Sequence, residues 1–292
     1  MAVLLSGGKD KYLNHLVSME RSGETIRGYR TVLNYLEEYF AIKYNRDVYL
    51  DEVTFGDLDD FICSMSTEKK WQINSVKKCH YVLSSFFGYC YRKELCPKDI
   101  SKQMEPVKGE QKERVYLTTE EFERLINHLD HHIVKHIALT MFYSGIRISE
   151  CLNLKIGDLD FKRSVFKIRK GKGKTFRLVP MHEKLKKILK SYLKDNNLRD
   201  FKVREGRVFA TARSGAISAV YVNQKLKEAS LKAGLPKGIS AHVLRHSFAS
   251  NLVNKNRSLV HVQKLLGHAD LRTTGIYTHA KLDELAESVN IL

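Results

Sequence analysis

The sequence contains no long hydrophobic run. Across its 292 residues no stretch approaches membrane-spanning length, and the apolar part of the opening MAVLLSGGKDKY is too short for a signal peptide. Internal repeats and low-complexity segments are also absent. These absences argue against a membrane protein and a repeat protein. We expect a cytoplasmic protein without a membrane partner.

Cysteine is scarce. The chain has five cysteines, an odd number, and none of them forms a CxxC pair: Cys63, Cys79, Cys90, Cys96 and Cys151. This spacing argues against a disulfide framework and against a zinc site. We therefore expect reduced thiols, most of them buried.

Signatures of a nucleotide or metal cofactor are missing too. The tripeptide GKT at 173–175 imitates the end of a phosphate-binding loop, but Ile168 stands where that loop requires glycine. His128, His132 and His136 are spaced to share one helical face, yet no carboxylate or cysteine group completes a set of metal ligands. We expect no cofactor and no metal.

Acidic residues are in deficit. The chain has 33 Asp and Glu against 50 Lys and Arg, a net charge of +17. This excess is interleaved with aromatic residues rather than gathered in a tail, which favours a folded surface that meets phosphate. On charge alone, a merely soluble basic protein remains an alternative. Hydrophobic residues make up 43% of the chain, enough to bury a core.

Apolar residues of the first hundred positions recur at intervals of three and four, which predicts helices. The stretches with this spacing are 13–17, 26–40, 57–65 and 73–91. Six basic residues flank the last of them: Lys69, Lys70, Lys77, Lys78, Arg92 and Lys93. The periodicity lapses in the charged segment after residue 102. We predict a helical domain over 1–105, a linker over 106–115 and a second domain over 116–292.

The second half combines helices with one hairpin. Helical spacing is found near 119–129, 132–143, 147, 182–195, 218–233, 241–254, 258–266 and 282–290. Thr118 and Glu121 are typical of a capping box that begins the first of these helices. The segment SVFKIRKGKGKTFRLVP alternates apolar and polar residues around Gly-Lys-Gly, which indicates a β-hairpin.

Five residues of the second half form a set that could act on an anion: Arg147, His242, Arg245, His268 and Tyr277. His242 and Arg245 are three apart in a helical stretch, so both project from one face, where an anion would be a suitable partner. Taken singly, the pair could be a solvated helix face and the tyrosine could be half-buried packing. Together they could attack a phosphodiester without a metal, because two guanidiniums can neutralise its developing charge.

These residues occur in motifs that resemble the tyrosine recombinase (phage integrase) superfamily, and within it the Xer-like two-domain recombinases. The motifs, in chain order, are SGIRISE, GKGKTFRLVP, HVLRHSFAS, LLGHADLRTT and IYTH. The resemblance covers nearly the whole chain and is strongest from Thr118 to Ala280. It implies an α-helical core-binding (SAM-like) domain, followed by a mixed α/β, mainly helical catalytic domain with a small β-sheet.

The resemblance also implies a role for each residue of the set. Arg147 and Arg245 would clamp the scissile phosphate, and Tyr277 would be the nucleophile. His242 would accept or donate a proton, and His268 would hydrogen-bond a non-bridging oxygen.

Two further positions match supporting residues of the family. Lys172, in the turn of the hairpin, matches the general acid, with Lys170 and Lys174 as alternatives. Glu150 matches an acidic residue that orients Arg147 rather than reacting.

By the same resemblance, the protein would be a site-specific recombinase that cleaves and rejoins duplex DNA through a 3′-phosphotyrosine. It would act as a homotetramer on paired sites, with residues 282–290 docking onto a neighbouring subunit; accessory DNA-bending proteins are further candidate partners. A tyrosine-type topoisomerase and a non-catalytic DNA-binding protein of the same fold are the alternatives. The target sequence, and the choice between integration and dimer or cointegrate resolution, are left open.

Overall fold

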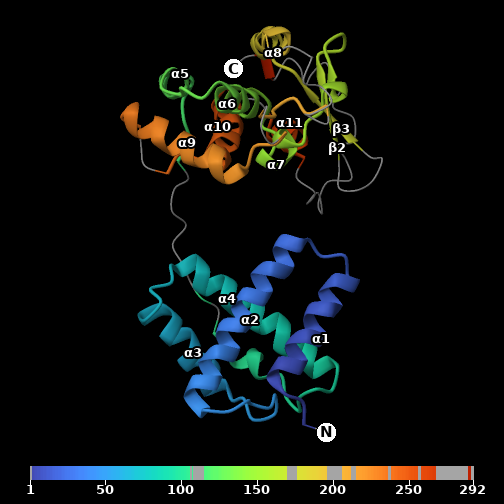
Figure 1. The fold of residues 1–292 in the computed structure, drawn as a ribbon, viewed down its shortest axis with the longest axis vertical. Helices are drawn as coiled ribbons and strands as arrows, with labels where there is room; N and C mark the ends of the chain where they lie inside the picture. Colours follow the sequence, from blue (N-terminus) through green and yellow to red (C-terminus); the bar gives the residue numbers. More distant parts are fainter. Residues whose placement is uncertain are drawn as a thin grey trace. The chain divides into compact units, whose positions relative to one another are not determined.

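The computed structural model describes residues 2–105, 107, 115–169, 176–195, 206–211, 215–235, 238–255, 258–267 and 289–290. The chain divides into two compact units, Met1–Lys112 and Glu113–Leu292, each with its own hydrophobic core (Figure 1). The described parts are mainly helical, with a small antiparallel sheet in the second unit, which confirms the predicted fold class. Most of the predicted linker lies outside the described residues.

Over residues 2–105, the first unit is a helical bundle centred on α4. It contains α1 (Leu5–Ser18), α2 (Gly23–Tyr44), α3 (Phe55–Thr67), α4 (Ile73–Arg92) and the short 3-10 helix η1 (Ile100–Gln103). The other three α-helices all pack on α4 (Figure 1). Val82, Phe86 and Cys90 recur every four residues along α4 and are fully buried, because one stripe of the helix faces the core.

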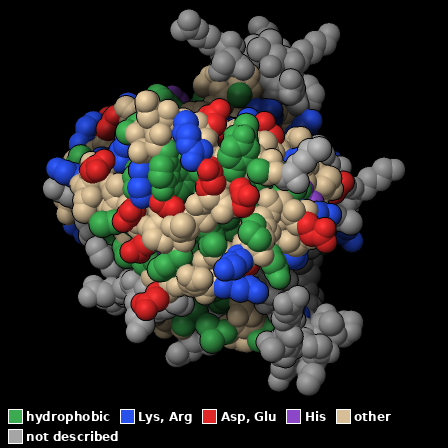
Figure 2. All heavy atoms as spheres, turned by 90° about the horizontal axis from the view of Figure 1, so that it is seen from below, with side chains coloured by type: hydrophobic (Ala, Val, Ile, Leu, Met, Phe, Trp, Pro, Cys, Tyr) green, Lys and Arg blue, Asp and Glu red, His purple; other side chains and the backbone are tan. Residues whose placement is uncertain are grey.

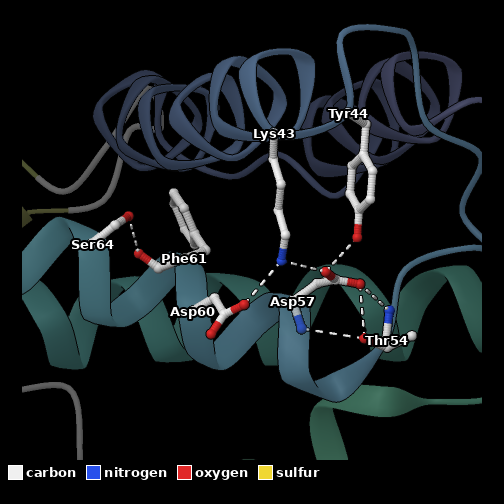
Figure 3. A network of polar contacts seen from close by, with 7 residues as sticks. All are labelled: Lys43, Tyr44, Thr54, Asp57, Asp60, Phe61 and Ser64. Atoms are coloured by element: carbon white, nitrogen blue, oxygen red, sulfur yellow. Dashed lines mark hydrogen bonds and ion pairs between the residues drawn. The ribbon is translucent and has the colours of Figure 1, made fainter.

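A single carboxylate joins the end of α2 to the start of α3 (Figure 3). Asp57 accepts a hydrogen bond from the backbone N–H of Thr54 at 2.9 Å, and its own N–H donates to Thr54 Oγ1 at 3.2 Å. The same carboxylate accepts from Lys43 Nζ at 2.8 Å and from the Tyr44 hydroxyl at 2.6 Å. Lys43 also donates to Asp60 at 2.9 Å. This network caps α3 and fixes α2 against it.

The second unit is built around the buried helix α6. Its helices are α5 (Thr119–Asn127), α6 (His132–Ser144), α7 (Ile148–Leu152), α8 (Glu183–Asp195), α9 (Ala219–Lys232), α10 (Ala241–Asn254) and α11 (Leu259–Leu266). Helix α6 packs most extensively on α10, and α5, α7, α8 and α9 also contact it. The predicted capping box begins α5: Glu121 accepts from the Thr118 N–H at 2.9 Å. His128 follows α5 and His132 begins α6, so the prediction that His128, His132 and His136 share one helical face is wrong.

The predicted hairpin is present. Strands β2 (Val165–Arg169) and β3 (Phe176–Pro180) pair in antiparallel register, and the turn that joins them lies outside the described residues. A third strand, β1 (Leu159–Asp160), adds to β2 after the 3-10 helix η2 (Ile156–Asp158). The sequence analysis did not predict β1, because two residues are too few to show a periodicity.

The predicted C-terminal helix is described at residues 289–290. Val289 is fully buried in a cluster with Phe248 and Leu252 of α10 and with residues of α11. Asn290 Oδ1 accepts a hydrogen bond from the Glu183 N–H at 2.9 Å, at the first residue of α8. In this structure the two residues therefore pack on their own unit. Docking of residues 282–290 onto a neighbouring subunit stays a prediction.

The cysteines are free thiols. Four are buried, and Cys63 is exposed. Burial raises the pKa of the Cys79 and Cys90 thiols to about 12, so they stay protonated and unreactive at neutral pH. None of the helices in the described ranges combines the length and the apolar character that crossing a membrane requires.

Candidate active site

The site begins at the tight turn between α6 and α7. Gly145 ends α6 in the left-handed conformation, with a φ of 65°. A Cβ at this position would lie 2.4 Å from Cδ1 of Phe248 on α10, so no other residue fits without displacing that ring. The turn brings α6 close to α10 and directs the chain to Arg147, two residues later.

Arg245 lies on α10 and is 8% exposed. Its Nη1 donates to the carbonyl oxygen of Gly145, and its Nη2 donates to the carbonyl oxygen of Leu266 at 2.7 Å. The sequence analysis did not predict these two main-chain partners, and its expectation of an anionic partner for Arg245 stays a prediction. The guanidinium is thereby fixed between the end of α6 and the end of α11.

The carboxylate of Glu150 accepts hydrogen bonds from two arginines, Arg147 and Arg177. It accepts from the backbone N–H of Arg147 at 2.8 Å and from Arg147 Nη1 at 3.1 Å, and the first of these bonds caps the start of α7. Arg177 of β3 donates two parallel hydrogen bonds to the same carboxylate, at 2.7 and 2.9 Å. The Arg147 side chain remains 44% exposed, so it is free to meet a ligand.

Near Glu150 the positive charges outnumber the negative ones. Burial, and then the neighbouring charges of Arg147 and Arg177, lower the pKa of Arg245 to about 10, a shift that Glu150 opposes. Arg245 nevertheless stays a cation at neutral pH. Burial alone would raise the pKa of Glu150, but hydrogen bonds from Arg177 and Arg147 outweigh it and lower that pKa. Two guanidiniums therefore bind the Glu150 carboxylate and a third, that of Arg245, lies within the range of its charge, an arrangement suited to binding an oxyanion.

The structure brings together some of the predicted residues. Arg147, Glu150 and Arg245 converge, and His242 lies exposed in the first turn of α10, one turn before Arg245. Three predicted residues lie outside the described residues, together with the two alternatives to the first of them: Lys172, His268 and Tyr277, with Lys170 and Lys174.

Sequence reasoning missed Arg177. It faces Ile168 across the hairpin, and residues directly opposite in an antiparallel pair share a face. Ile168 and Val179 on that face are both buried in the core. The period-2 pattern therefore placed an arginine on an apolar strand face, where it needs a buried acidic partner. That signal could have paired it with Glu150.

The predicted basic residues around α4 lie largely at the surface of the first unit. Lys69, Lys70, Lys78, Arg92 and Lys93 are exposed and Lys77 is half-buried. Two exposed tyrosines of the same helix accompany them, Tyr81 at 67% and Tyr91 at 46%. On the face drawn in Figure 2, by contrast, basic and acidic side chains are interspersed with apolar ones, so the charge excess is not concentrated on that face.

Residues 115–284, which contain this site and more than half of the chain, match the phage integrase family. The chain belongs to that family. It is 32% identical over 286 residues to the tyrosine recombinase XerC of Thermodesulfovibrio yellowstonii, covering 94% of this chain and 92% of the relative. It is therefore a tyrosine recombinase, an enzyme of site-specific DNA recombination.

Solved structures of the family share the fold. The Tn1549 transposon integrase in complex with a circular intermediate DNA superposes with a TM-score of 0.75 at 20% identity, covering 97% of each chain. A λ integrase tetramer bound to a Holliday junction gives a TM-score of 0.74 at 18% identity, covering 94% of this chain and 80% of that one.

Proposed function

We propose that this recombinase cleaves and rejoins duplex DNA through a covalent 3′-phosphotyrosine intermediate, with Tyr277 as the nucleophile. The observation that carries the proposal is that Arg147 and Arg177 both donate to the single carboxylate of Glu150, while Arg245 adds a third cation at the Gly145 turn, two residues before Arg147. A phosphodiester is an anion, and guanidinium groups fork onto its non-bridging oxygens. The surplus charge is suited to that ligand.

In the proposed cleavage step, the Tyr277 hydroxyl attacks the scissile phosphorus. The bond from the tyrosine oxygen to phosphorus forms as the bond from phosphorus to the 5′ oxygen breaks. Negative charge builds up on the non-bridging oxygens, where Arg147 and Arg245 neutralise it, with a hydrogen bond from His268. Because these cations do what a metal does elsewhere, the step requires none.

Two proton transfers complete the step. A free tyrosine has a pKa of about 10 and is a poor nucleophile at neutral pH, so its proton passes to a base, for which His242 is the candidate. The departing 5′ oxygen is a strong base and takes a proton from Lys172, or from Lys170 or Lys174 in the same turn. The phosphotyrosine keeps the energy of the ester, so attack by another 5′-hydroxyl rejoins the strand without ATP.

We infer that the protein acts on double-stranded DNA in the cytoplasm, with the first unit on one side of the duplex and the second unit performing the chemistry. The exposed basic and tyrosine side chains of α4 support a phosphate-contacting role for the first unit. The λ integrase of similar fold was solved as a tetramer on a Holliday junction, which supports assembly of four subunits on paired sites. Residues 282–290 would then exchange between subunits, and accessory DNA-bending proteins would be additional partners.

The first test is capture of the intermediate. Covalent protein–DNA adducts formed by the wild-type protein on fragmented DNA of the source genome are isolated and sequenced to locate the cleavage site. A duplex of that sequence, nicked next to the cleavage point, then traps the adduct. We expect Tyr277→Phe to abolish the adduct and to bind the duplex with unchanged affinity, because the substitution removes one oxygen atom.

An adduct that persists in Tyr277→Phe would mean that another residue is the nucleophile. Absence of any adduct with the wild-type protein would support a binding function without catalysis. Relaxation of a supercoiled plasmid that lacks the mapped site would favour the topoisomerase alternative, since a recombinase requires its site.

A further inference from the structure

The side chain of Arg177 on β3 makes shorter hydrogen bonds to Glu150 than the side chain of Arg147 does. Arg177 Nη1 lies 2.7 Å from Oε1 and Nη2 lies 2.9 Å from Oε2, a bidentate fork. The side chain of Arg147 makes one bond to the same carboxylate, at 3.1 Å, which is the longest of the four that Glu150 accepts from the two arginines. The orientation of the carboxylate is therefore set mainly by Arg177.

Arg177 is also the better buried of the two arginines. Its side chain is 12% exposed, whereas that of Arg147 is 44% exposed. An ion pair that is screened from water interacts more strongly than a surface pair, and both of its partners lose freedom to reorient. Arg177 is thus a buried structural residue of the site, whereas the side chain of Arg147 reaches solvent.

A second contact of Arg177 reaches the end of α11. Gly267 ends that helix with a φ of 63°, and a Cβ there would lie 2.7 Å from Nε and 2.9 Å from Cδ and Cζ of Arg177. The guanidinium therefore occupies the space that a side chain at 267 would need. Leu266, the preceding residue, is one of the two carbonyl anchors of Arg245, and the residue that follows is His268.

We propose that Arg177 is a positioning residue for DNA cleavage. It holds Glu150, and through Glu150 the backbone and side chain of Arg147; on its other edge it sets the distance to the end of α11. This inference rests on the proposed function, and it gives Arg177 no contact with DNA. A lysine could keep the charge but could not make two parallel hydrogen bonds, so the fork itself is the property to test.

The test compares Arg177→Lys and Arg177→Ala with the wild-type full-length protein on the nicked duplex that carries the mapped site. The rate of adduct formation and the Kd for the duplex are measured separately. We expect Arg177→Lys to slow adduct formation by about 10- to 100-fold, because misplacing a reacting group by about 1 Å costs on the order of 100-fold, while the Kd changes less than about threefold. Arg177→Ala should lose more, and added guanidinium should restore part of its rate by entering the vacated space.

A matched control is available in the first unit. Arg46 donates two hydrogen bonds to Glu52, at 2.9 and 2.8 Å, and Glu52 also accepts from the Tyr49 N–H at 2.8 Å, three residues earlier in the chain. The hydrogen-bonding pattern is that of Arg177 and Glu150, but both side chains are largely exposed. Arg46→Lys should cleave at the wild-type rate.

A further variant, Glu150→Gln, tests whether Arg177 acts through Glu150. If Arg177 acts through Glu150, the double variant Arg177→Lys/Glu150→Gln should be no slower than the slower single variant, whereas additive losses would refute a shared path. Cleavage by Arg177→Lys at the wild-type rate would overturn the inference, as would a loss fully explained by less folded protein in a thermal melt. Failure of the wild-type protein to form adduct would refute the proposed function instead, so the two failures are distinguishable.

Discussion

The two units of the chain use the same local device to different ends. In each, a carboxylate at the third residue of a helix accepts from the backbone N–H that begins the helix and from a cation on another element. Around Asp57 one cation, Lys43, donates to two carboxylates, those of Asp57 and Asp60 (Figure 3). This network has no surplus of positive charge, and we call it closed. Around Glu150 two arginines, Arg147 and Arg177, donate to one carboxylate. Here the cations outnumber the carboxylate, and we call the network open. A closed network serves stability, whereas an open one keeps capacity for an anion.

The pKa shifts follow this difference in charge balance. Burial would raise the pKa of Asp57, but hydrogen bonds from Lys43, Tyr44 and Thr54 outweigh it and bring that pKa well below its usual range. Hydrogen bonds to Asp57 and Asp60 in turn raise the pKa of Lys43. In the second unit burial and like charge lower the pKa of Arg245, so that cation lacks the compensation that Lys43 has.

The largest expected effect is at the open network. Arg245→Ala should reduce the rate of adduct formation by about 1000-fold, since it removes a donor that stabilises the developing oxyanion. Its Kd for the duplex should change little, because many other lysines and arginines hold the DNA backbone. Lys43→Ala is the counterpart at the closed network and should leave the rate per bound complex unchanged. An equal loss of affinity in Arg245→Ala would show that this arginine mainly binds DNA.

A smaller effect distinguishes the two carboxylates. Asp57→Asn should lower the free energy of unfolding of the first unit by about 2 kcal/mol, since it weakens a helix cap and charged hydrogen bonds, and should leave cleavage intact. Glu150→Gln should slow cleavage about tenfold or more without changing that free energy.

Trp71 provides the measurement. It is the only tryptophan of the chain, and it packs in the first unit with its ring centroid 5.7 Å from that of Tyr35, so its fluorescence in urea follows this unit. If Asp57→Asn slowed cleavage as much as Glu150→Gln, the proposed contrast between the two networks would be wrong.

The smallest effect is on the pH dependence of stability. The pKa of Asp57 is lowered in the folded protein, so its carboxylate contributes stability above the unfolded-state pKa of about 3.9 and loses it as the pH falls toward the folded-state value. The difference in unfolding free energy between wild type and Asp57→Asn should be constant from about pH 5 to 7 and narrow below about pH 4. Urea titrations followed by Trp71 fluorescence at each pH measure it, and a difference that widens in acid would contradict the assigned pKa shift.

Local signals in the sequence were sufficient for most of the fold. Helix periodicity located the helices of both units to within a few residues at most ends, except at the start of α1, and Thr118 with Glu121 marked the start of α5 correctly. Alternation around Gly-Lys-Gly gave the β2–β3 hairpin. These features depend on residues close together in the chain, so a short window contains their cause.

The candidate site was predictable in part. Motifs identified Arg147, Glu150 and Arg245, but the ligands of Arg245 are main-chain carbonyls at Gly145 and Leu266, which no side-chain pattern reveals. The link from Arg177 to Glu150 spans 27 positions and depends on how the hairpin packs beside α7. Tertiary contacts of this kind arise only when the core closes.

Arg245 is tethered to the protein's own main chain by two of its five N–H groups, and this has a consequence for catalysis. Its orientation is preset, so it need not reorganise when a strand arrives or leaves. The forward and reverse reactions would then meet the same environment, as microscopic reversibility demands. Directionality in recombination would therefore have to come from elsewhere, such as the DNA or its assembly.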